Sequence, residues 1–387
     1  MSQRNITLKE PSEPVDLLII AGEHSGDEHA ARLLKKISEN EPDLKVYAVG
    51  GRHLVAAGAV QIFDLTLHSV IGIVEVLKNY GFFMELFKKL LVWIERVQPK
   101  NILFVDYPGF NLRLAEQLYK RKLSRKGGGD IGVFYYISPQ VWAWKAKRRF
   151  KIAKWVDSLG TLFPFEIESY SDTNLDVSFV GHPFIDEEFK SPVVFDPEGP
   201  VLLLPGSRLG PVCRIFPVLM EAFETFAKKH PDARAAVIYP SVEVKELLEA
   251  MLADYASVRD RVVLEPNDKQ VSGRAVLMSS GTISLICALA GLPGAIVYKL
   301  NTFSYLFGKV VVKVPFIGIE NILLKRAIHP EFIQKVDVEA LAQELIDSVS
   351  NAHRIQAASS AAEELKKILS PKSDQSVYEW LSTRLVR

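Results

Sequence analysis

Short apolar segments rich in β-branched residues alternate with segments of helical periodicity along almost the whole chain. This alternation is typical of parallel α/β folds, in which a helix connects each strand to the next. In the first half, the predicted strands are Val15–Ala21, Lys45–Val49, Asn101–Asp106, Ile131–Ser138, Ser158–Phe163 and Val177–Val180. A second series comprises Val201–Leu204, Ala233–Tyr239, Arg261–Leu264, Ala275–Met278 and Ala295–Tyr298.

Helical patterns lie between these strands, as at Asp27–Ser38, Leu112–Lys122 and Lys147–Asp157, and dominate after Val336. The acidic, proline-rich stretch 183–200 separates the two series and has no strong period, so we interpret it as a linker. A chain of 387 residues also exceeds the usual size of a single core. We therefore predict two Rossmann-like domains, at 1–185 and 186–345. The C-terminal helices at 346–387 either stay with the second domain or pack back on the first.

The composition excludes several classes of protein. With 48% hydrophobic and 24% charged residues the chain is an ordinary globular protein, and two cysteines are too few for a disulfide framework. The sequence predicts no secretory signal and no apolar run long enough to span a membrane. The net charge of +1 conceals a basic segment, because residues 81–154 contain 16 Lys and Arg but 5 Asp and Glu. A local basic surface is therefore compatible with the neutral total.

The segment AGEHSGDEH, residues 21–29, directly follows the first strand. Strand ends of a doubly wound sheet open onto the ligand crevice, which favours Glu23, Ser25 and Asp27 as site residues. The alternative is a helix cap, because Ser25 and Asp27 are also good capping residues. A metal site is not indicated, since the spacing of His24 and His29 sets their side chains about 140° apart on a helix.

The segment FVDYPGFN, residues 104–111, is a second strand end. Asp106 closes the apolar strand, and we expect Pro108 and Gly109 to form a turn that holds its carboxylate over the crevice. A partly shielded carboxylate has a raised pKa, which suits a general base. Helix capping is again the alternative.

Aromatic and basic residues are interleaved in YYISPQVWAWKAKRRFKIAKW, residues 135–155. Such mixtures stack on nucleic-acid bases or place rings in a lipid interface with cations at the headgroups. A buried tryptophan is common, but Trp142 and Trp144 beside four cations indicate more than a core.

Two strand ends of the second series suit phosphate. In LLLPGSR, residues 202–208, Gly206 permits close backbone approach and Arg208 can pair with phosphate. In MSSGTISL, residues 278–285, a strand leads through small hydroxylated residues into a helix whose N–H groups favour anions. Together these segments indicate a nucleotide diphosphate site.

These segments, in this order, resemble the lipid-A-disaccharide synthase family, bacterial glycosyltransferases of GT-B architecture. The matching motifs are AGE-x-SGD at 21–27, IGIVEVL at 71–77, VDYPGFN at 105–111, YYISPQVWAWKAKRRFKI at 135–152, FVGHPF at 179–184, LLPGSR at 203–208, SSGT at 279–282 and PEFIQ at 330–334. The resemblance implies two Rossmann-like domains whose parallel sheets face a cleft. It also implies transfer from UDP-2,3-diacylglucosamine to 2,3-diacylglucosamine 1-phosphate, with inversion, to form a β(1→6) disaccharide and UDP.

The resemblance also assigns roles to residues. Asp106 matches the essential aspartate of the family and is the expected base, supported by Glu23 and Ser25. The residues expected to bind UDP are Gly206, Ser207, Arg208, Ser280, Gly281, Thr282, Asn321, Glu331 and Gln334. Those expected on the acceptor and lipid side are Ile71, Trp142, Trp144, Lys145, Arg148 and Arg149.

No metal, cofactor or nucleic acid is expected to take part, and no oligomeric state follows from the residues. Because both substrates carry acyl chains, we expect a cytoplasmic protein in peripheral contact with lipid on the inner face of the cytoplasmic membrane.

Two positions depart from the family pattern in the nucleotide half. Pro211 follows GSR where the family has glutamate and an aliphatic residue, and Ile286 replaces a glutamate expected at the nucleotide ribose. The alternative hypothesis is therefore a non-catalytic or altered-donor relative that binds lipid or a partner protein. An RNA-binding protein is a weaker alternative, because the aromatic and basic segment belongs to the sugar-transferase motif.

Overall fold

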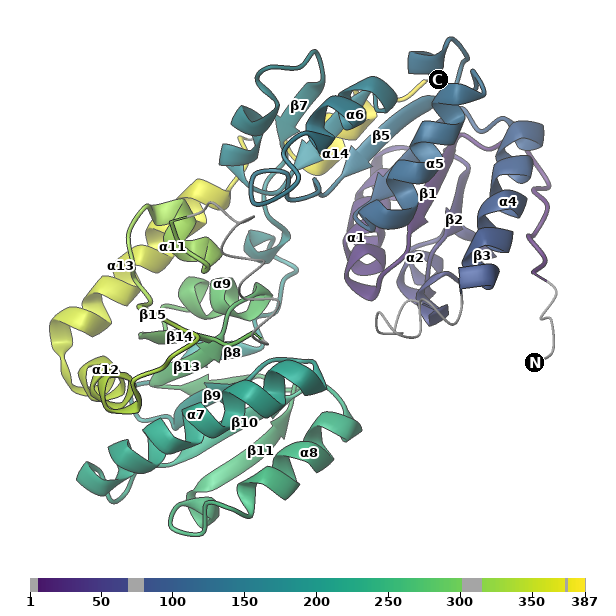
Figure 1. Ribbon diagram of the computed structural model, residues 1–387. Helices are drawn as coiled ribbons and strands as arrows, with labels where there is room; N and C mark the ends of the chain where they lie inside the picture. The colour runs from purple at the N-terminus through teal and green to yellow at the C-terminus, as the bar shows by residue number, and fades with distance from the viewer. Residues whose placement is uncertain (1–5, 69–79, 301–314, 373–374, 387) are drawn as a thin grey trace. The chain divides into compact units, whose positions relative to one another are not determined.

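The chain forms two compact α/β units (Figure 1). The computed structural model describes residues 6–68, 80–300, 315–372 and 375–386. Unit 1 comprises Met1–Pro183 and Pro371–Arg387, and unit 2 is the continuous segment Phe184–Ser370. The structure therefore divides after residues 183 and 370, whereas the sequence analysis set its boundaries after 185 and 345.

Unit 1 contains a seven-stranded sheet with the order β3-β2-β1-β4-β5-β6-β7, in which all neighbouring strands are parallel. The strands are β1 (Leu17–Ala21), β2 (Val46–Val49), β3 (Val60–Phe63), β4 (Asn101–Val105), β5 (Gly132–Tyr136), β6 (Ser158–Thr161) and β7 (Asp176–Phe179). The central strands are buried along their whole length, which explains their continuous apolar sequences.

Helices cover both faces of this sheet. They are α1 (His24–Asn40), α2 (Arg52–Ala56), α4 (Tyr80–Val97), α5 (Pro108–Lys120), α6 (Arg148–Trp155) and α14 (Val377–Ser382). Short 3-10 turns lie at η1 (Thr66–His68), η2 (Arg125–Gly127) and η3 (Pro164–Tyr170). One apolar cluster packs α4, α5 and α6 on the sheet, and a second packs α1 and α14 on its other face.

The last residues of the chain complete unit 1. The Trp380 indole packs against Gly160, where a Cβ would lie 3.2 Å from the ring, and its Nε1 donates to the Ser158 hydroxyl at 2.8 Å. The Asn101 side chain bonds both backbone groups of Val386, at 2.8 and 2.9 Å. The C-terminal segment is thus an integral part of the fold of unit 1.

Unit 2 contains a six-stranded parallel sheet with the order β11-β10-β9-β13-β14-β15, and a two-stranded ribbon of β8 and β12. The strands are β8 (Val193–Phe195), β9 (Val201–Leu204), β10 (Ala235–Tyr239), β11 (Val262–Pro266), β12 (Val271–Gly273), β13 (Ala275–Ser279), β14 (Gly294–Tyr298) and β15 (Glu331–Ile333). The helices are α7 (Leu209–Lys229), α8 (Val242–Leu252), α9 (Thr282–Leu289), α11 (Ile319–Leu324), α12 (Val338–Ser350) and α13 (Ala352–Leu369). Two 3-10 turns, η4 (Pro183–Ile185) and η5 (Arg259–Arg261), complete the elements.

The two faces of this sheet are covered differently. Helices α7, α8 and α12 cover one face and form its main apolar cluster. Helix α9 and the β8–β12 ribbon pack on the other face in a smaller cluster. The ribbon corrects one expectation, because residues 183–200 are not a simple linker: Val193 is fully buried and β8 pairs with β12.

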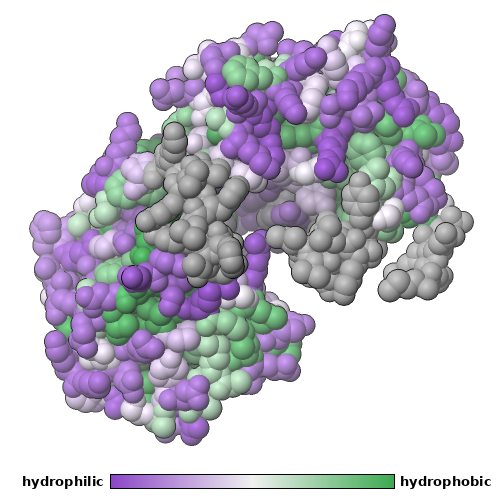
Figure 2. Space-filling model, in the orientation of Figure 1, coloured by the Kyte–Doolittle hydropathy of each residue, from purple (hydrophilic) through white to green (hydrophobic). Residues whose placement is uncertain are grey.

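Two helices begin earlier than the sequence patterns predicted. Helix α1 begins at His24 instead of Asp27, and α5 begins at Pro108, so Pro108 and Gly109 form a first helical turn. Of the described residues, no helix is both long and apolar enough to cross a membrane. On the face drawn in Figure 2, hydrophilic residues are interspersed with smaller hydrophobic patches on both units.

Candidate active site

The strand orders locate the ligand-binding edge of each sheet. In unit 1 the order reverses between β1 and β4, and in unit 2 between β9 and β13. Ligands of doubly wound sheets bind at this switch point, outside the carboxyl ends of the strands. The loops that leave these four strands contain residues 22–23, 106–107, 205–208 and 280–281. The sequence analysis singled out all four.

The loops after β1 and β4 are in close contact. A Cβ at Gly22 would lie 2.3 Å from the ring of Tyr107, so only glycine fits here without displacing that ring. Glu23 is exposed at the start of α1. Burial, and after it the Glu23 charge, raises the pKa of both Asp106 and Tyr107. The structure therefore places Glu23 close enough to Asp106 for their charges to interact. Ser25 is exposed in the first turn of α1.

Asp106 is held by its main chain in an unusual conformation. Asp106 and Tyr107 have φ angles of 46° and 49°, a left-handed region that non-glycine residues seldom adopt. The Asp106 carbonyl accepts from the Tyr135 hydroxyl at 2.6 Å and from Asn111 Nδ2 at 2.8 Å, and its N–H donates to the Tyr136 carbonyl at 3.0 Å. These bonds fix the backbone and leave the carboxylate free of side-chain partners among the described residues.

The environment of Asp106 suits proton transfer. Burial, and after it the nearby Glu23 carboxylate, raises the pKa of its carboxyl from 3.8 to about 6, while the Tyr107 N–H opposes the shift. A carboxylate with a pKa near 6 is ionised at neutral pH and is more basic than an ordinary aspartate. Asn111 and Tyr135 lie within the motifs at 105–111 and 135–152, but the sequence did not indicate that they support Asp106.

Asp27 has a structural role that its motif did not reveal. Its fully buried carboxylate accepts from the backbone N–H groups of Gly51, at 2.7 Å, and His53, at 2.9 Å. These N–H groups are at the start of α2, so Asp27 caps a neighbouring helix and not its own. The predicted local cap by Ser25 or Asp27 is therefore wrong.

The two tryptophans of the aromatic and basic segment differ in their environments. Trp144 is 42% exposed, with Lys145 Nζ 4.2 Å and the Arg148 guanidinium 5.7 Å from its ring centre. Trp142 is half-buried and packs edge-on against Phe165 at 5.1 Å. Trp144 thus lies at the protein surface with two cations near its ring, whereas Trp142 packs against Phe165 within unit 1.

Two other predicted lipid-side residues are constrained or undescribed. Arg149 pairs with Asp172, with Nε and Oδ1 2.6 Å apart, and lies over Phe150. Ile71 lies outside the described residues. Of the residues expected on the lipid side, Trp144, Lys145 and Arg148 therefore lie together in one cluster.

In unit 2 the loops after β9 and β13 form an open edge. Gly206 has a φ of 113°, and Gly281 has a φ of 144° with no atom within 4 Å of a Cβ placed there. Arg208 is exposed at the start of α7, and Thr282 is exposed at the start of α9. The N-termini of α7 and α9, which follow the adjacent strands β9 and β13, can present backbone N–H groups to an anion. Ser207 is exposed in the same loop.

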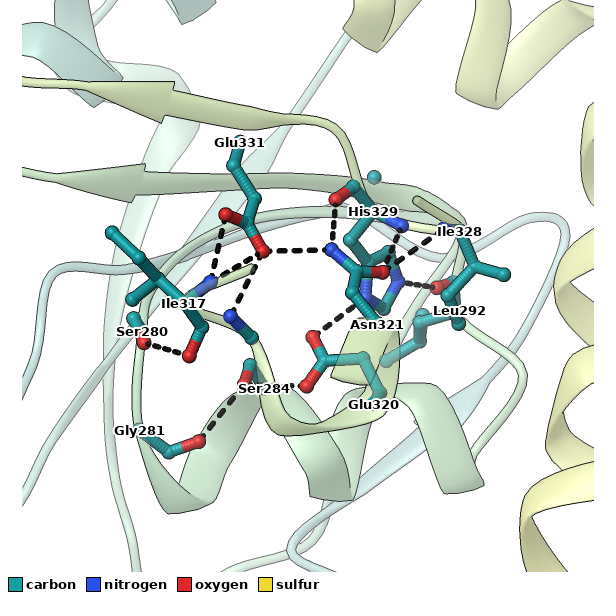
Figure 3. A network of polar contacts seen from close by, with 12 residues as sticks. Ser280, Gly281, Ser284, Leu292, Ile317, Glu320, Asn321, Ile328, His329 and Glu331 are labelled. Atoms are coloured by element: carbon teal, nitrogen blue, oxygen red, sulfur yellow. Dashed lines mark hydrogen bonds and ion pairs between the residues drawn. The ribbon is translucent and has the colours of Figure 1, made fainter. Parts of the chain in front are cut away.

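Three of the residues predicted to bind UDP, Asn321, Glu331 and Gln334, form hydrogen bonds within the chain, and Figure 3 shows the first two. The Glu331 carboxylate accepts from the N–H groups of Ile317, at 2.9 Å, and Gly318, at 2.9 Å. It also accepts from Asn321 Nδ2 at 2.9 Å. The Gln334 amide bonds both backbone groups of residue 300, at 3.1 and 2.9 Å.

A second polar network, which is buried, lies next to these Glu331 contacts (Figure 3). His329 Nδ1 lies 3.1 Å from Glu320 Oε1, and Ser284 Oγ donates to Glu320 Oε2 at 2.9 Å. Ser284 also donates to the Gly281 carbonyl at 2.9 Å, and Ser280 donates to the Ile317 carbonyl at 3.3 Å. The network therefore connects the loop after β13 to the segment before α11.

The two departures from the family pattern have structural explanations. Pro211 lies in the first turn of α7, where its missing N–H removes no helical hydrogen bond. Ile286 is 8% exposed and packs in the apolar cluster on the face of the sheet that α9 and the β8–β12 ribbon cover. Both residues therefore fit the fold. In the described part of the chain, no cluster of three or more His, Cys, Asp or Glu suits a metal ion.

Two doubly wound, Rossmann-like units in one chain are the units of the GT-B fold. Solved structures agree on this fold: a glycosyltransferase from Rickettsia africae has a TM-score of 0.53 at 13% identity and covers 96% of this chain and 97% of its own. A UDP-GlcNAc 2-epimerase from Methanocaldococcus jannaschii, in complex with UDP-GlcNAc and UDP, has a TM-score of 0.53 at 9% identity, with 91% and 99% covered.

Sequence comparison identifies the family. A family model described as lipid-A-disaccharide synthetase matches residues 17–380. Lipid-A-disaccharide synthase 1 of Legionella pneumophila is 34% identical over 346 residues, 87% of this chain and 88% of that protein. The synthase of Geobacter metallireducens is 35% identical over 344 residues, 85% and 86% of the two chains. The chain belongs to the lipid-A-disaccharide synthase family and is a hexosyltransferase.

Proposed function

We propose that this chain joins UDP-2,3-diacylglucosamine to 2,3-diacylglucosamine 1-phosphate, forming the β(1→6) disaccharide 1-phosphate and UDP. Family membership supports the reaction class. The observation that carries the mechanism is Asp106, a strand-end carboxylate with a pKa of about 6 at the switch point of its sheet.

Asp106 acts as the general base in this proposal. Its carboxylate takes the proton of the acceptor 6-hydroxyl while that oxygen attacks C1 of the donor sugar. The bond from C1 to the UDP oxygen breaks, UDP leaves with the electron pair, and attack from the opposite face inverts C1. Burial and, after it, the Glu23 charge keep the pKa of Asp106 high, and Ser25, exposed in the first turn of α1, is a further hydrogen-bonding group in this proposal.

The loops of unit 2 hold the departing diphosphate. Arg208 supplies a positive charge, and the helix N-termini after Gly206 and Gly281 supply N–H groups, with the hydroxyls of Ser280 and Thr282 beside them. Asn321, Glu331 and Gln334 fix the neighbouring backbone in this proposal, because their polar atoms bond the chain itself. The reaction needs no metal or cofactor in this scheme.

We place the protein in the cytoplasm, on the inner face of the cytoplasmic membrane. Both substrates are acylated, and the exposed Trp144 with Lys145 and Arg148 suits an interface of apolar chains and anionic headgroups. This contact is peripheral.

One observation favours a second candidate, an altered-donor or non-catalytic relative. Ile286 replaces a carboxylate expected at the ribose and is packed in an apolar cluster, so it offers the donor no hydrogen bond. A relative of this kind retains lipid or partner binding through unit 1.

The deciding experiment incubates the purified chain with both labelled substrates and follows disaccharide and UDP. The first proposal expects both products from the wild type, none from Asp106→Ala and unchanged amounts from Asp130→Ala, an exposed aspartate of the same unit. It also expects kcat/KM to rise as the pH passes about 6, because the base must be ionised. UDP binding without products from the wild type would favour the second candidate.

A further inference from the structure

A large pocket in unit 2 lies at the end of the sheet opposite Arg208. It has a volume of about 1000 Å³ and is lined by residues that precede three strands. Pro200, Arg234 and Arg274 stand immediately before or at the amino ends of β9, β10 and β13. Strand β9 has four residues, so about 13 Å of strand separates this pocket from the loop that leads to Arg208. The pocket is therefore distinct from the proposed transfer site.

Arg234 and Arg274 lie in register across the sheet. The N–H of Val201 donates to the Arg234 carbonyl at 2.9 Å, and the N–H of Arg274 donates to the Pro200 carbonyl at 3.1 Å. Pro200 thus lies between the two arginines, which places their Cα atoms about 10 Å apart, two strand spacings.

Both arginine side chains belong to the same face of the sheet. Side chains alternate along a strand, so Arg234 shares the face of Ala236 and Arg274 that of Val276. Ala236 and Val276 belong to the apolar cluster opposite α7 and α8. Ala236 also lines the pocket floor, together with Val263, which is 54% exposed.

Four cations around this pocket lack ionic partners. Within the described part of the chain, no ion pair or side-chain hydrogen bond forms at Lys229, Arg234, Lys269 or Arg274. The Arg274 Nε is buried without a hydrogen-bond partner. In the same unit, by contrast, Arg354 pairs with Glu344, with Nε and Oε1 2.8 Å apart. A buried donor without a partner is costly, which indicates a site completed by an anion.

Three carboxylates, of Glu198, Asp232 and Glu265, also line the pocket and form no ion pair with its cations. These carboxylates can accept hydrogen bonds from hydroxyl or amino groups of a ligand whose anionic group binds Arg234 and Arg274. The volume is at the upper end for small-molecule sites and far exceeds a single phosphate. We propose that this pocket binds a soluble phosphorylated metabolite of nucleotide size, with its phosphates held between Arg234 and Arg274.

Calorimetric titration of the full chain with inorganic pyrophosphate tests the charged part of this proposal. An Arg208→Ala background separates it from the transfer site. In that background we expect saturable binding that weakens by about tenfold or more in Arg234→Ala and in Arg274→Ala. Arg274→Lys should bind with an intermediate affinity, because it keeps the charge but loses the paired donors.

The matched control is Arg259→Ala, an exposed arginine of the same unit that pairs with Asp260. Its affinity for pyrophosphate should stay within about twofold of the background. Equal affinities in the background and the two pocket variants would overturn the proposal, as would an equal loss in the control. Should Arg274→Ala fail to fold, Arg234→Ala and Lys269→Ala give the same comparison.

Two further titrations test the size and source of the ligand. ADP should bind the Arg208→Ala protein more tightly than pyrophosphate, and equal affinities would reject a ligand of nucleotide size. Vesicles containing phosphatidic acid should sediment the background and the Arg234→Ala variant equally. A loss of sedimentation specific to the pocket variants would assign the site to lipid headgroups and overturn a soluble ligand.

Discussion

Replacing Asp106 by asparagine should stabilise unit 1 while it removes the proposed base. The pKa of the Asp106 carboxyl rises from 3.8 to about 6 on folding, mainly through burial and then through Glu23. A raised carboxyl pKa means that the folded state binds the proton more tightly than the unfolded state. Stability is therefore lost as the pH rises from about 4 to about 6 and stays lost above that range.

The free-energy cost of the ionised Asp106 carboxylate follows from the size of its pKa shift. About two pKa units at about 1.4 kcal/mol each give a cost of about 3 kcal/mol for the ionised carboxylate at pH 8. At pH 4 the same shift costs less than about 1 kcal/mol, because the folded carboxyl is protonated. The asparagine side chain of the Asp106→Asn variant would be neutral at both pH values, and asparagine tolerates the left-handed backbone that position 106 requires.

Denaturant unfolding followed by tryptophan fluorescence measures this difference. All five tryptophans belong to unit 1, so the signal reports that unit alone. Asp106→Asn should exceed the wild type by up to about 3 kcal/mol at pH 8 and by less than about 1 kcal/mol at pH 4. Asp130→Asn, at an exposed position, should show no such dependence. The same gain at both pH values would refute a buried, destabilised carboxylate.

Four other substitutions test three separate parts of the structure. Gly22→Ala should displace the Tyr107 ring and destabilise unit 1 by about 1–3 kcal/mol, with a loss of turnover; unchanged unfolding and kinetics would contradict the 2.3 Å approach. Glu331→Gln should destabilise unit 2 by about 2 kcal/mol and weaken UDP binding in calorimetry, and an unchanged stability would show that its bonds contribute little. Trp144→Ala should reduce sedimentation with anionic vesicles at a stability within about 0.5 kcal/mol of wild type, whereas Trp142→Ala should cost about 2 kcal/mol. Equal effects of the two tryptophans on both measurements would reject their division into surface and support.

The sequence predicted the central strands well, because buried parallel strands have continuous apolar sequences. It did not reveal β3, β8, β12 and β15, which are short and lie near the sheet edges or in the ribbon. It also placed the start of α1 at Asp27, since Ser25 and Asp27 read as local caps. The carboxylate of Asp27 instead bonds Gly51 and His53, and sequence spacing alone cannot show such a long-range contact.

The position of the candidate site could be predicted from the sequence, but the residues that support it could not. Glu23 and Asp106 were singled out because each follows an apolar strand, and the structure places both in strand-end loops at the switch point of their sheet. Asn111 and Tyr135 were not singled out, because their role depends on the left-handed turn that exposes the Asp106 carbonyl to them. Gln334 was expected near the UDP phosphates, and the sequence did not reveal that its amide bonds the backbone of residue 300.

The return of the C-terminal segment to unit 1 has a consequence for synthesis. Unit 2 is continuous, so all of its residues emerge from the ribosome before the last segment of unit 1. The Trp380 indole and the backbone of Val386, which bond Ser158 of β6 and Asn101 of β4, emerge only after the whole of unit 2. Although unit 1 is translated first, it is the second to be completed, and premature termination after unit 2 would leave unit 1 unfinished.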